Sequence, residues 1–204
     1  MSQLIIGLEG HDGTGKSSTA IAIANLLGGR VFFSDQETKS LRKQVYESES
    51  LSRAEKMAAI EKIYLQETER FETEMKDADI VVLDRTFLSH SVEENVRDKL
   101  DFDKKATYSL KFIPEEVTRP DVIFQVIIPE QERNRRVVAR GEKLSSRDTR
   151  LSEDEIYRNE LEAERKKHGC ITLRLRNRDP ETCALRAVQT LLGLKQIIPI
   201  TVKH

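Results

Sequence analysis

The residues most suited to chemistry lie near the amino terminus, between Gly10 and Ser17. They fit the pattern GxxxxGK[ST], which is typical of a P-loop that binds nucleotide phosphates. Its glycines let successive backbone N–H groups face inward at the positive end of a following helix, where a polyphosphate is stabilised. The lysine can reach the β- and γ-phosphates, and the serine hydroxyl can ligate Mg²⁺. The predicted residues for binding a nucleoside triphosphate are Gly10, Asp12, Gly13, Thr14, Gly15, Lys16, Ser17 and Ser18.

A second acidic group is expected at the end of a neighbouring strand, because Mg²⁺ bound to a P-loop nucleotide needs one. Asp84 follows the apolar run Ile80–Leu83 and fills that place, so Ser17 and Asp84 are the predicted metal ligands. Arg85 follows at once, and its guanidinium could hold an incoming phosphate in a bidentate manner. The alternative for Asp84 and Arg85 is a salt bridge at the strand end.

A basic segment extends from Arg133 to Arg150. Arg133, Arg136 and Arg140 are three and four residues apart, so on a helix they would share one face and could point at a common anion. We expect a basic lid at about 133–150 that closes over the phosphates and excludes water. A solvated charged helix and loop is the alternative.

Short apolar runs alternate with segments of helical character along the whole chain. This alternation predicts an α/β fold with three αβα layers around a five-stranded parallel sheet, in a single domain over residues 1–204. The expected strands are Leu4–Leu8, Val31–Phe33, Ile80–Leu83, Val122–Ile128 and Cys170–Leu175. The expected helices are Lys16–Leu27, Ser40–Ser48, Ala54–Lys76, Ser91–Ser109, Gln131–Arg140, Glu153–Lys166 and a last one capped by Asp179. The tail Lys195–His204 is left unassigned.

Composition excludes several classes of protein. The 34 basic residues nearly balance 35 acidic ones, so overall charge gives no reason to expect binding to nucleic acid or a membrane. No apolar stretch approaches the roughly 18 residues of a membrane span, and no signal peptide is evident, so we expect a cytoplasmic protein. Cys170 and Cys183 fit neither a zinc site nor a redox pair and are predicted to be reduced packing residues. The histidines show no ligand spacing, so Mg²⁺ carried by the nucleotide is the one metal expected.

Taken together, these motifs resemble the thymidylate kinase family of P-loop nucleoside monophosphate kinases. The similarity spans roughly residues 4–192. It rests on Leu8–Thr19, Asp84-Arg85 with Ser89 beyond, Arg119-Pro120-Asp121, Ala139-Arg140-Gly141 and Arg147-Asp148. The resemblance implies a P-loop kinase fold, transfer of the ATP γ-phosphoryl group to a (deoxy)nucleoside monophosphate with Mg²⁺, and a homodimer.

The resemblance also assigns catalytic roles. Lys16, with Arg140 or Arg147, would stabilise the transferring phosphoryl group. Asp84 would organise Mg²⁺, Arg85 would hold the acceptor phosphate, and Asp12 would lie near the acceptor sugar. Gly13 occupies a position that carries arginine in some members, so the catalytic arginine is expected from the lid.

Departures from the family pattern cluster in the acceptor pocket and spare the donor site. The stretch Thr86–Glu94 replaces an aromatic residue and an alanine-tyrosine-glutamine run, and Asp35–Thr38 replaces a proline-glycine turn. On the long helix, Lys62 is the expected basic residue. These changes argue against thymidylate itself as the acceptor. The predicted acceptor-binding residues are Asp12, Lys62, Arg85, Ser89 and Glu93.

Other functions stay open at this stage. The acceptor could be a nucleoside, a modified nucleotide or a modified base within DNA, although Arg85 favours one that already bears a phosphate. A GTP-dependent switch protein would need an Asn-Lys-x-Asp-like motif, which Asn177-Arg178-Asp179 resembles only loosely. A non-catalytic module with a vestigial P-loop is hard to reconcile with Lys16, Ser17 and Asp84 together.

Overall fold

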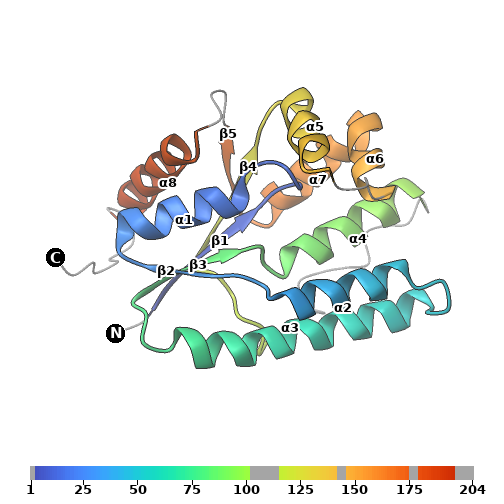
Figure 1. The fold of residues 1–204 in the computed structure, drawn as a ribbon, viewed down its shortest axis with the longest axis horizontal. Coiled ribbons are helices and arrows are strands. Elements are labelled where there is room, and N and C mark those ends of the chain that lie inside the picture. Colours follow the sequence, from blue (N-terminus) through green and yellow to red (C-terminus); the bar gives the residue numbers. More distant parts are fainter. Residues whose placement is uncertain (1–2, 102–114, 142–145, 175–178, 196–204) are drawn as a thin grey trace.

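The computed structural model describes residues 3–101, 115–141, 146–174 and 179–195. In this part of the chain, five parallel strands form one sheet in the order β2-β3-β1-β4-β5 (Figure 1). They are β1 (Leu4–Glu9), β2 (Arg30–Phe32), β3 (Ile80–Asp84), β4 (Val122–Ile127) and β5 (Ile171–Arg174). Helices cover both faces of the sheet, which confirms the predicted three-layer α/β fold.

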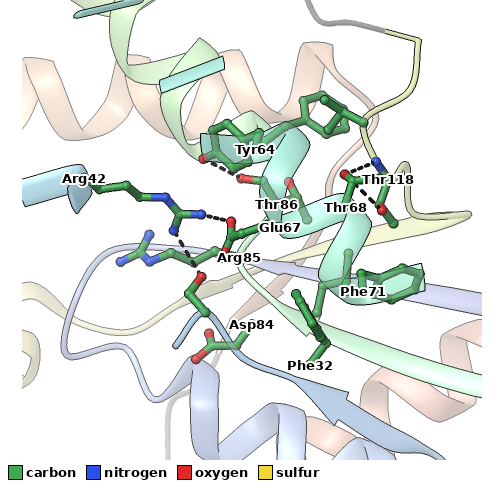
Figure 2. A pocket seen from close by; sticks show the side chains of 14 residues that line it. Phe32, Arg42, Tyr64, Glu67, Thr68, Phe71, Asp84, Arg85, Thr86 and Thr118 are labelled. Atoms are coloured by element: carbon green, nitrogen blue, oxygen red, sulfur yellow. Dashed lines mark hydrogen bonds and ion pairs between the residues drawn. The ribbon is translucent and has the colours of Figure 1, made fainter. Parts of the chain in front are cut away.

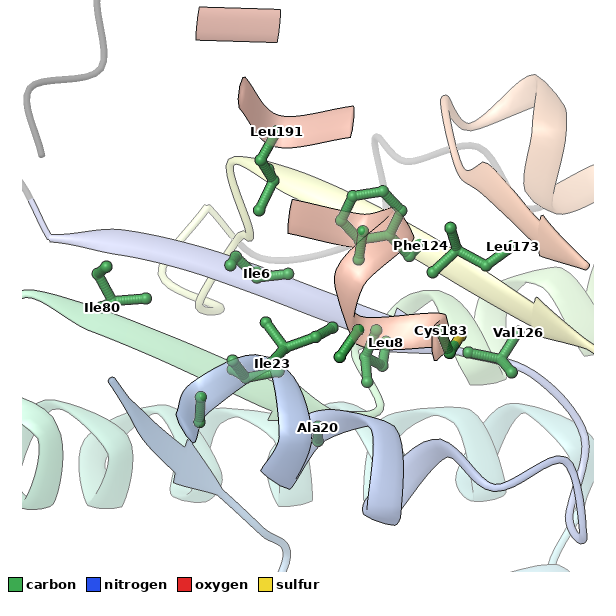
Figure 3. Close-up of a cluster of buried hydrophobic side chains, with 14 of the residues drawn as sticks. Ile6, Leu8, Ala20, Ile23, Ile80, Phe124, Val126, Leu173, Cys183 and Leu191 are labelled. Carbon is green, nitrogen blue, oxygen red and sulfur yellow. The ribbon is translucent and has the colours of Figure 1, made fainter. Parts of the chain in front are cut away.

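Two helices, α1 (Lys16–Leu27) and α8 (Pro180–Lys195), cover one face of the sheet. Ile80 and Val82 of β3 point to this side and pack with Ile23 of α1 and other buried side chains (Figure 3). The alternate residues of β3 point to the opposite face. Burial on both faces explains why the strands read as continuous apolar runs.

The opposite face is covered by α3 (Arg53–Met75), α4 (Leu88–Asp101) and α7 (Glu155–Lys167), with α2 (Gln36–Glu47) packed on α3. Val81 and Leu83 of β3 pack there against Phe71 of α3. Ser52 and Glu55 form a capping box that starts α3, which satisfies backbone donors that would otherwise lack partners. The long helix predicted over Ala54–Lys76 is therefore confirmed.

Several helix boundaries differ from those expected, and at α2 and α7 a side-chain cap explains the difference. Asp35 accepts a hydrogen bond from the Thr38 N–H, so α2 begins at Gln36 rather than at Ser40. Asp154 caps α7, which separates it from α6 (Ser146–Glu153), a helix that the sequence prediction missed. Helix α5 (Glu130–Ala139) matches its prediction within one residue, and α4 begins at Leu88 rather than Ser91. Residues 102–109 of that predicted helix, and the tail beyond Lys195, lie outside the described residues.

Two remaining predictions concern single residues and short segments. Cys170 and Cys183 are free and buried, as expected of packing residues. Asp179 accepts hydrogen bonds from the backbone of Glu181 and Thr182, so it caps α8 as predicted. Among the described residues, no helix is long and apolar enough to cross a membrane.

The parallel register brings the chemically important residues to one edge of the sheet. Leu8 of β1 pairs with Asp84 of β3, so both strands end side by side. The P-loop leaves β1 at this edge, and Arg85 leaves β3 there. Ligands of open α/β sheets bind outside the carboxyl ends of the strands, so this edge is the candidate active site.

Candidate active site

The P-loop backbone has the curled form that its glycines predict. Gly10, Gly13 and Gly15 have φ angles of 143°, 85° and 90°, a region that other residues rarely adopt. A Cβ atom on Gly13 would lie 2.8 Å from a methyl carbon of Val137 and 3.0 Å from the carbonyl oxygen of Arg133. Glycine is therefore required at position 13 both for backbone conformation and for the close approach of α5.

Lys16 is buried at the centre of this loop. Its ammonium group donates a hydrogen bond to the His11 carbonyl oxygen at 2.8 Å and lies 3.7 Å from an Asp12 carboxylate oxygen. Burial, and then the charge of Arg85, lower the pKa of Lys16 to about 7. A polyphosphate would favour the charged form of this lysine, because an anion nearby offsets the cost of burying the ammonium group.

Ser17 and Asp84 meet across the P-loop. The Ser17 hydroxyl donates a hydrogen bond to Asp84 Oδ2 at 2.5 Å, although the residues are 67 positions apart. The other oxygen, Asp84 Oδ1, is buried and has no hydrogen-bond partner within the described residues. A hydroxyl beside a carboxylate oxygen with spare acceptor capacity suits Mg²⁺, which prefers oxygen ligands. In the described part of the chain, no group of three or more His, Cys, Asp or Glu side chains is arranged so that it could hold a metal ion by itself.

Arg85 has the one positive φ angle among the described non-glycine residues, at 85°. This conformation turns its side chain toward the P-loop, where it forms an ion pair with Asp12. Its Nη1 also donates to the Gly10 carbonyl oxygen at 3.3 Å and to Ser89 Oγ at 3.4 Å. The structure thus brings together three predicted site residues from distant positions.

A pocket opens beside Asp84 and Arg85, between the ends of β2 and β3 and helices α2 and α3 (Figure 2). Arg42 of α2 forms an ion pair with Glu67 of α3, and its guanidinium lies 4.8 Å from the centre of the Tyr64 ring. Arg42 Nε and Glu67 Oε1 are buried without hydrogen-bond partners among the described residues. The pocket is lined by Phe32, Ser34, Arg42, Tyr64, Glu67, Thr68, Phe71, Leu83, Asp84, Arg85, Thr86, Phe87, Val117 and Thr118.

The structure does not place all the predicted acceptor residues in this pocket. Lys62 is exposed and does not line it, because Tyr64, Glu67 and Phe71 form the inward helical face and Lys62 lies outside that spacing. Glu93 lies on α4 and accepts a hydrogen bond from the Tyr157 hydroxyl at 3.3 Å. Besides Arg85, the basic residue that lines the pocket is Arg42 of α2, which the sequence analysis did not predict as a site residue.

The basic segment divides into residues with different surroundings. Arg133 is only 1% exposed and donates hydrogen bonds to Glu130, to Ser152 Oγ and to the Asp12 carbonyl oxygen, so it braces the loop. Arg136 lies over the P-loop: a Cβ atom added to Gly15 would be 3.2 Å from Arg136 Nη1. Arg140 is exposed at the end of α5. The three arginines therefore do not converge on one anion, because one of them belongs to the protein interior.

Arg147 and Ser18, two further predicted site residues, both lie in the first turn of a helix. Arg147 lies in the first turn of α6, and its side chain falls outside what the structure describes, as do residues 142–145 of the predicted lid. Ser18 is exposed on the first turn of α1, next to Ser17.

Sequence reasoning missed three residues that the structure places at this edge: Glu9, Arg42 and Glu67. Arg136 was named as part of the basic helical face, without a role of its own. A helical projection of α3 around Tyr64 could have found Glu67, since the two are three residues apart. Arg42 carries no such local signal, because its contact with Glu67 depends on how α2 packs on α3.

Comparison with known proteins agrees with this geometry. The family model described as thymidylate kinase matches residues 8–177. No curated relative matches the chain.

Solved structures share the fold at low sequence identity. A deoxyadenosine kinase from M. mycoides with dCMP and dCDP is 16% identical, with 93% of this chain and 100% of that chain covered and a TM-score of 0.62. Thymidylate kinase from Candida albicans is 13% identical, with 95% and 92% covered and a TM-score of 0.62. The YorR protein of Bacillus subtilis in complex with phosphorylated GDP is 14% identical, with 98% and 99% covered and a TM-score of 0.54.

Proposed function

The chain belongs to the thymidylate kinase family, and on that premise we propose that it transfers the γ-phosphoryl group of ATP to a (deoxy)nucleoside monophosphate other than thymidylate. Its family makes it a nucleotide kinase; the donor, the metal and the acceptor are the parts proposed here. The observation that carries the proposal is the arrangement of Lys16, the Ser17–Asp84 pair and Arg85 around one edge of the sheet.

The donor phosphates would lie in the P-loop. Its inward-facing amides and Lys16 supply fixed positive charge where the transferring group accumulates negative charge. Arg136 lies against Gly15 and is held by Glu132 through a 2.8 Å hydrogen bond. We assign to Arg136 the contact with the donor phosphates that the family resemblance gives to Arg140 or Arg147. Arg136 lies next to the loop and is partly exposed, whereas Arg133 is buried and bonded to the loop backbone.

Ser17 and Asp84 would hold Mg²⁺ together with the nucleotide. When bound, the metal ion would supply positive charge that offsets the charge of the phosphates during transfer. The protein's own contribution is to keep a hydroxyl and a carboxylate adjacent before any ligand arrives, so little reorganisation is needed.

Arg85 would bind the acceptor phosphate after exchanging its ion pair with Asp12 for the substrate anion. The acceptor nucleoside would then extend into the pocket beside Arg42 and Glu67. Because Glu67 is a hydrogen-bond acceptor with one buried oxygen unsatisfied, it favours an acceptor that presents an N–H or hydroxyl donor. An amino-bearing base offers more such donors than thymine does.

An ADP-release assay with ATP and a panel of nucleosides, nucleoside monophosphates and DNA tests the proposal. We expect turnover with one or more monophosphates, dependent on Mg²⁺, and its loss in Lys16→Ala without loss of the folded state. Activity confined to unphosphorylated nucleosides or to DNA would reject the proposed acceptor. Undiminished turnover by Lys16→Ala would reject the proposed donor site.

The homodimer, the cytoplasmic location and the single domain with a lid at about 133–150 stay predictions. Light scattering coupled to size-exclusion chromatography measures the mass of the assembly and tests the first of these.

A further inference from the structure

Glu9, the last residue of β1, carries a carboxylate that is fully buried directly before the P-loop. One of its oxygens accepts hydrogen bonds from the Thr86 N–H at 2.9 Å and from Thr86 Oγ1 at 2.8 Å. The other accepts from Ser89 Oγ at 2.7 Å, and Arg165 Nε lies 3.9 Å away. Burying a carboxylate costs free energy, even when hydrogen-bond partners offset part of the cost. A residue of this kind is therefore expected to have a role besides packing.

The contacts of Glu9 enclose the backbone of Arg85. The N–H of Arg85 donates to the Leu8 carbonyl oxygen at 3.0 Å, and the N–H of the next residue, Thr86, donates to Glu9. The two peptide groups on either side of the Arg85 Cα are thus bound to consecutive residues of β1. A positive φ angle in a non-glycine residue persists only where the surroundings determine it, and these two bonds do so.

Glu9 also acts on the other end of the Arg85 side chain. Ser89 Oγ donates a hydrogen bond to Glu9, so the lone pairs of this hydroxyl are left to accept from Arg85 Nη1 at 3.4 Å. The guanidinium can only donate, so the carboxylate helps by holding the Ser89 hydrogen away from it. Glu9 thereby fixes both the backbone from which Arg85 extends and one contact of its charged end.

We propose that Glu9, acting through Thr86 and Ser89, is a positioning residue that holds Arg85 ready for the acceptor phosphate. The inference rests on the proposed function, in which Arg85 binds that phosphate. It also explains why threonine follows Arg85, where the resemblance leads one to expect an aromatic residue. The threonine hydroxyl donates to Glu9, and the threonine methyl group fills the space beside Gly7. An aromatic side chain could do neither.

Calorimetric binding without ATP tests the inference, with the best monophosphate of the activity panel and its parent nucleoside as the two ligands. Thr86→Val keeps the shape but removes the hydroxyl, and Glu9→Gln removes the charge. We expect either variant to weaken monophosphate binding about tenfold, the effect of losing one charge-assisted contact. Nucleoside affinity should stay within about twofold of wild type, because it does not depend on Arg85. The KM for ATP should change less than the monophosphate affinity, because Arg85 reaches the donor site only through its charge and through Asp12.

Two further variants separate positioning from general stability. Thr86→Ser restores the donor to Glu9 and should recover most of the monophosphate affinity. Leu191→Ala removes a buried apolar side chain of α8 from the core cluster on the other face of the sheet, so it should lower the melting temperature without changing monophosphate affinity.

Unchanged monophosphate affinity in Thr86→Val and Glu9→Gln would overturn the inference, and so would an equal loss for nucleoside and ATP. If one variant does not fold, the other decides. A wild-type protein that binds the nucleoside as tightly as the monophosphate would refute the proposed acceptor itself, which is a different result.

Discussion

The lowered pKa of Lys16 predicts that nucleotide binding takes up a proton. In the ligand-free protein this pKa is about 7, so the ammonium group is about half deprotonated at pH 7 and about nine-tenths deprotonated at pH 8. Bound phosphates raise the pKa again, because they stabilise the charged form. Since the complex then binds more protons than the free protein, the affinity for ATP should fall about tenfold between pH 6 and pH 8.

Calorimetry in buffers of different ionisation enthalpy measures this uptake directly. We expect about half a proton per ATP at pH 7 and about nine-tenths at pH 8. Lys16→Arg is the matched control, because arginine stays charged throughout this range, and it also corrects for protons bound by ATP itself. Equal proton uptake by wild type and Lys16→Arg would refute the titration assigned to Lys16. So would a wild-type affinity for ATP that does not change with pH.

Three further predictions follow from contacts around the site. Arg136→Ala should lower kcat about hundredfold while Arg140→Ala changes it less than about threefold, as steady-state kinetics will show; similar losses in both would contradict the assignment of Arg136. Glu67→Gln replaces an acceptor with a group that can also donate, so it should shift the ratio of kcat/KM values between acceptors about tenfold toward bases richer in carbonyl groups. Glu61→Gln, an exposed change on the same helix, should leave this ratio unaltered. Burial lowers the pKa of His90 to about 4, below its value in the unfolded chain. The unfolded chain therefore takes up the proton first, and stability is lost as the pH falls from about 6.5 toward 4. Urea titrations should show a loss of about 3 kcal/mol by pH 4 that is absent in His90→Gln, and an identical pH profile in both proteins would exclude His90 as its source.

The fold was predictable because its signals are local. A strand buried on both faces must be apolar along its length, and each run of the sequence that meets this condition became a strand. The errors occurred where one polar side chain decides a boundary, as at Asp35 and Asp154. Helix α6 was missed because it is short and polar, with Leu151 as its fully buried residue.

The donor and acceptor halves of the site differ in how far they could be predicted. The P-loop is set by a few adjacent residues, so Lys16 and Ser17 lie where the motif puts them. The acceptor pocket depends on the packing of α2 on α3 and on the register of a long helix. Lys62 lies two positions before Tyr64 and therefore outside the face of α3 that lines the pocket, and the basic residue Arg42 comes from another helix.

Asp12 connects the two halves of the site in the ligand-free protein. Its carboxylate pairs with Arg85, the proposed acceptor clamp, and lies 3.7 Å from the Lys16 ammonium group of the donor site. Substrate phosphates must compete with Asp12 for both cations, and whichever substrate binds first changes the charge balance for the other. Donor and acceptor binding free energies should therefore be coupled rather than additive, because the two events share a single carboxylate.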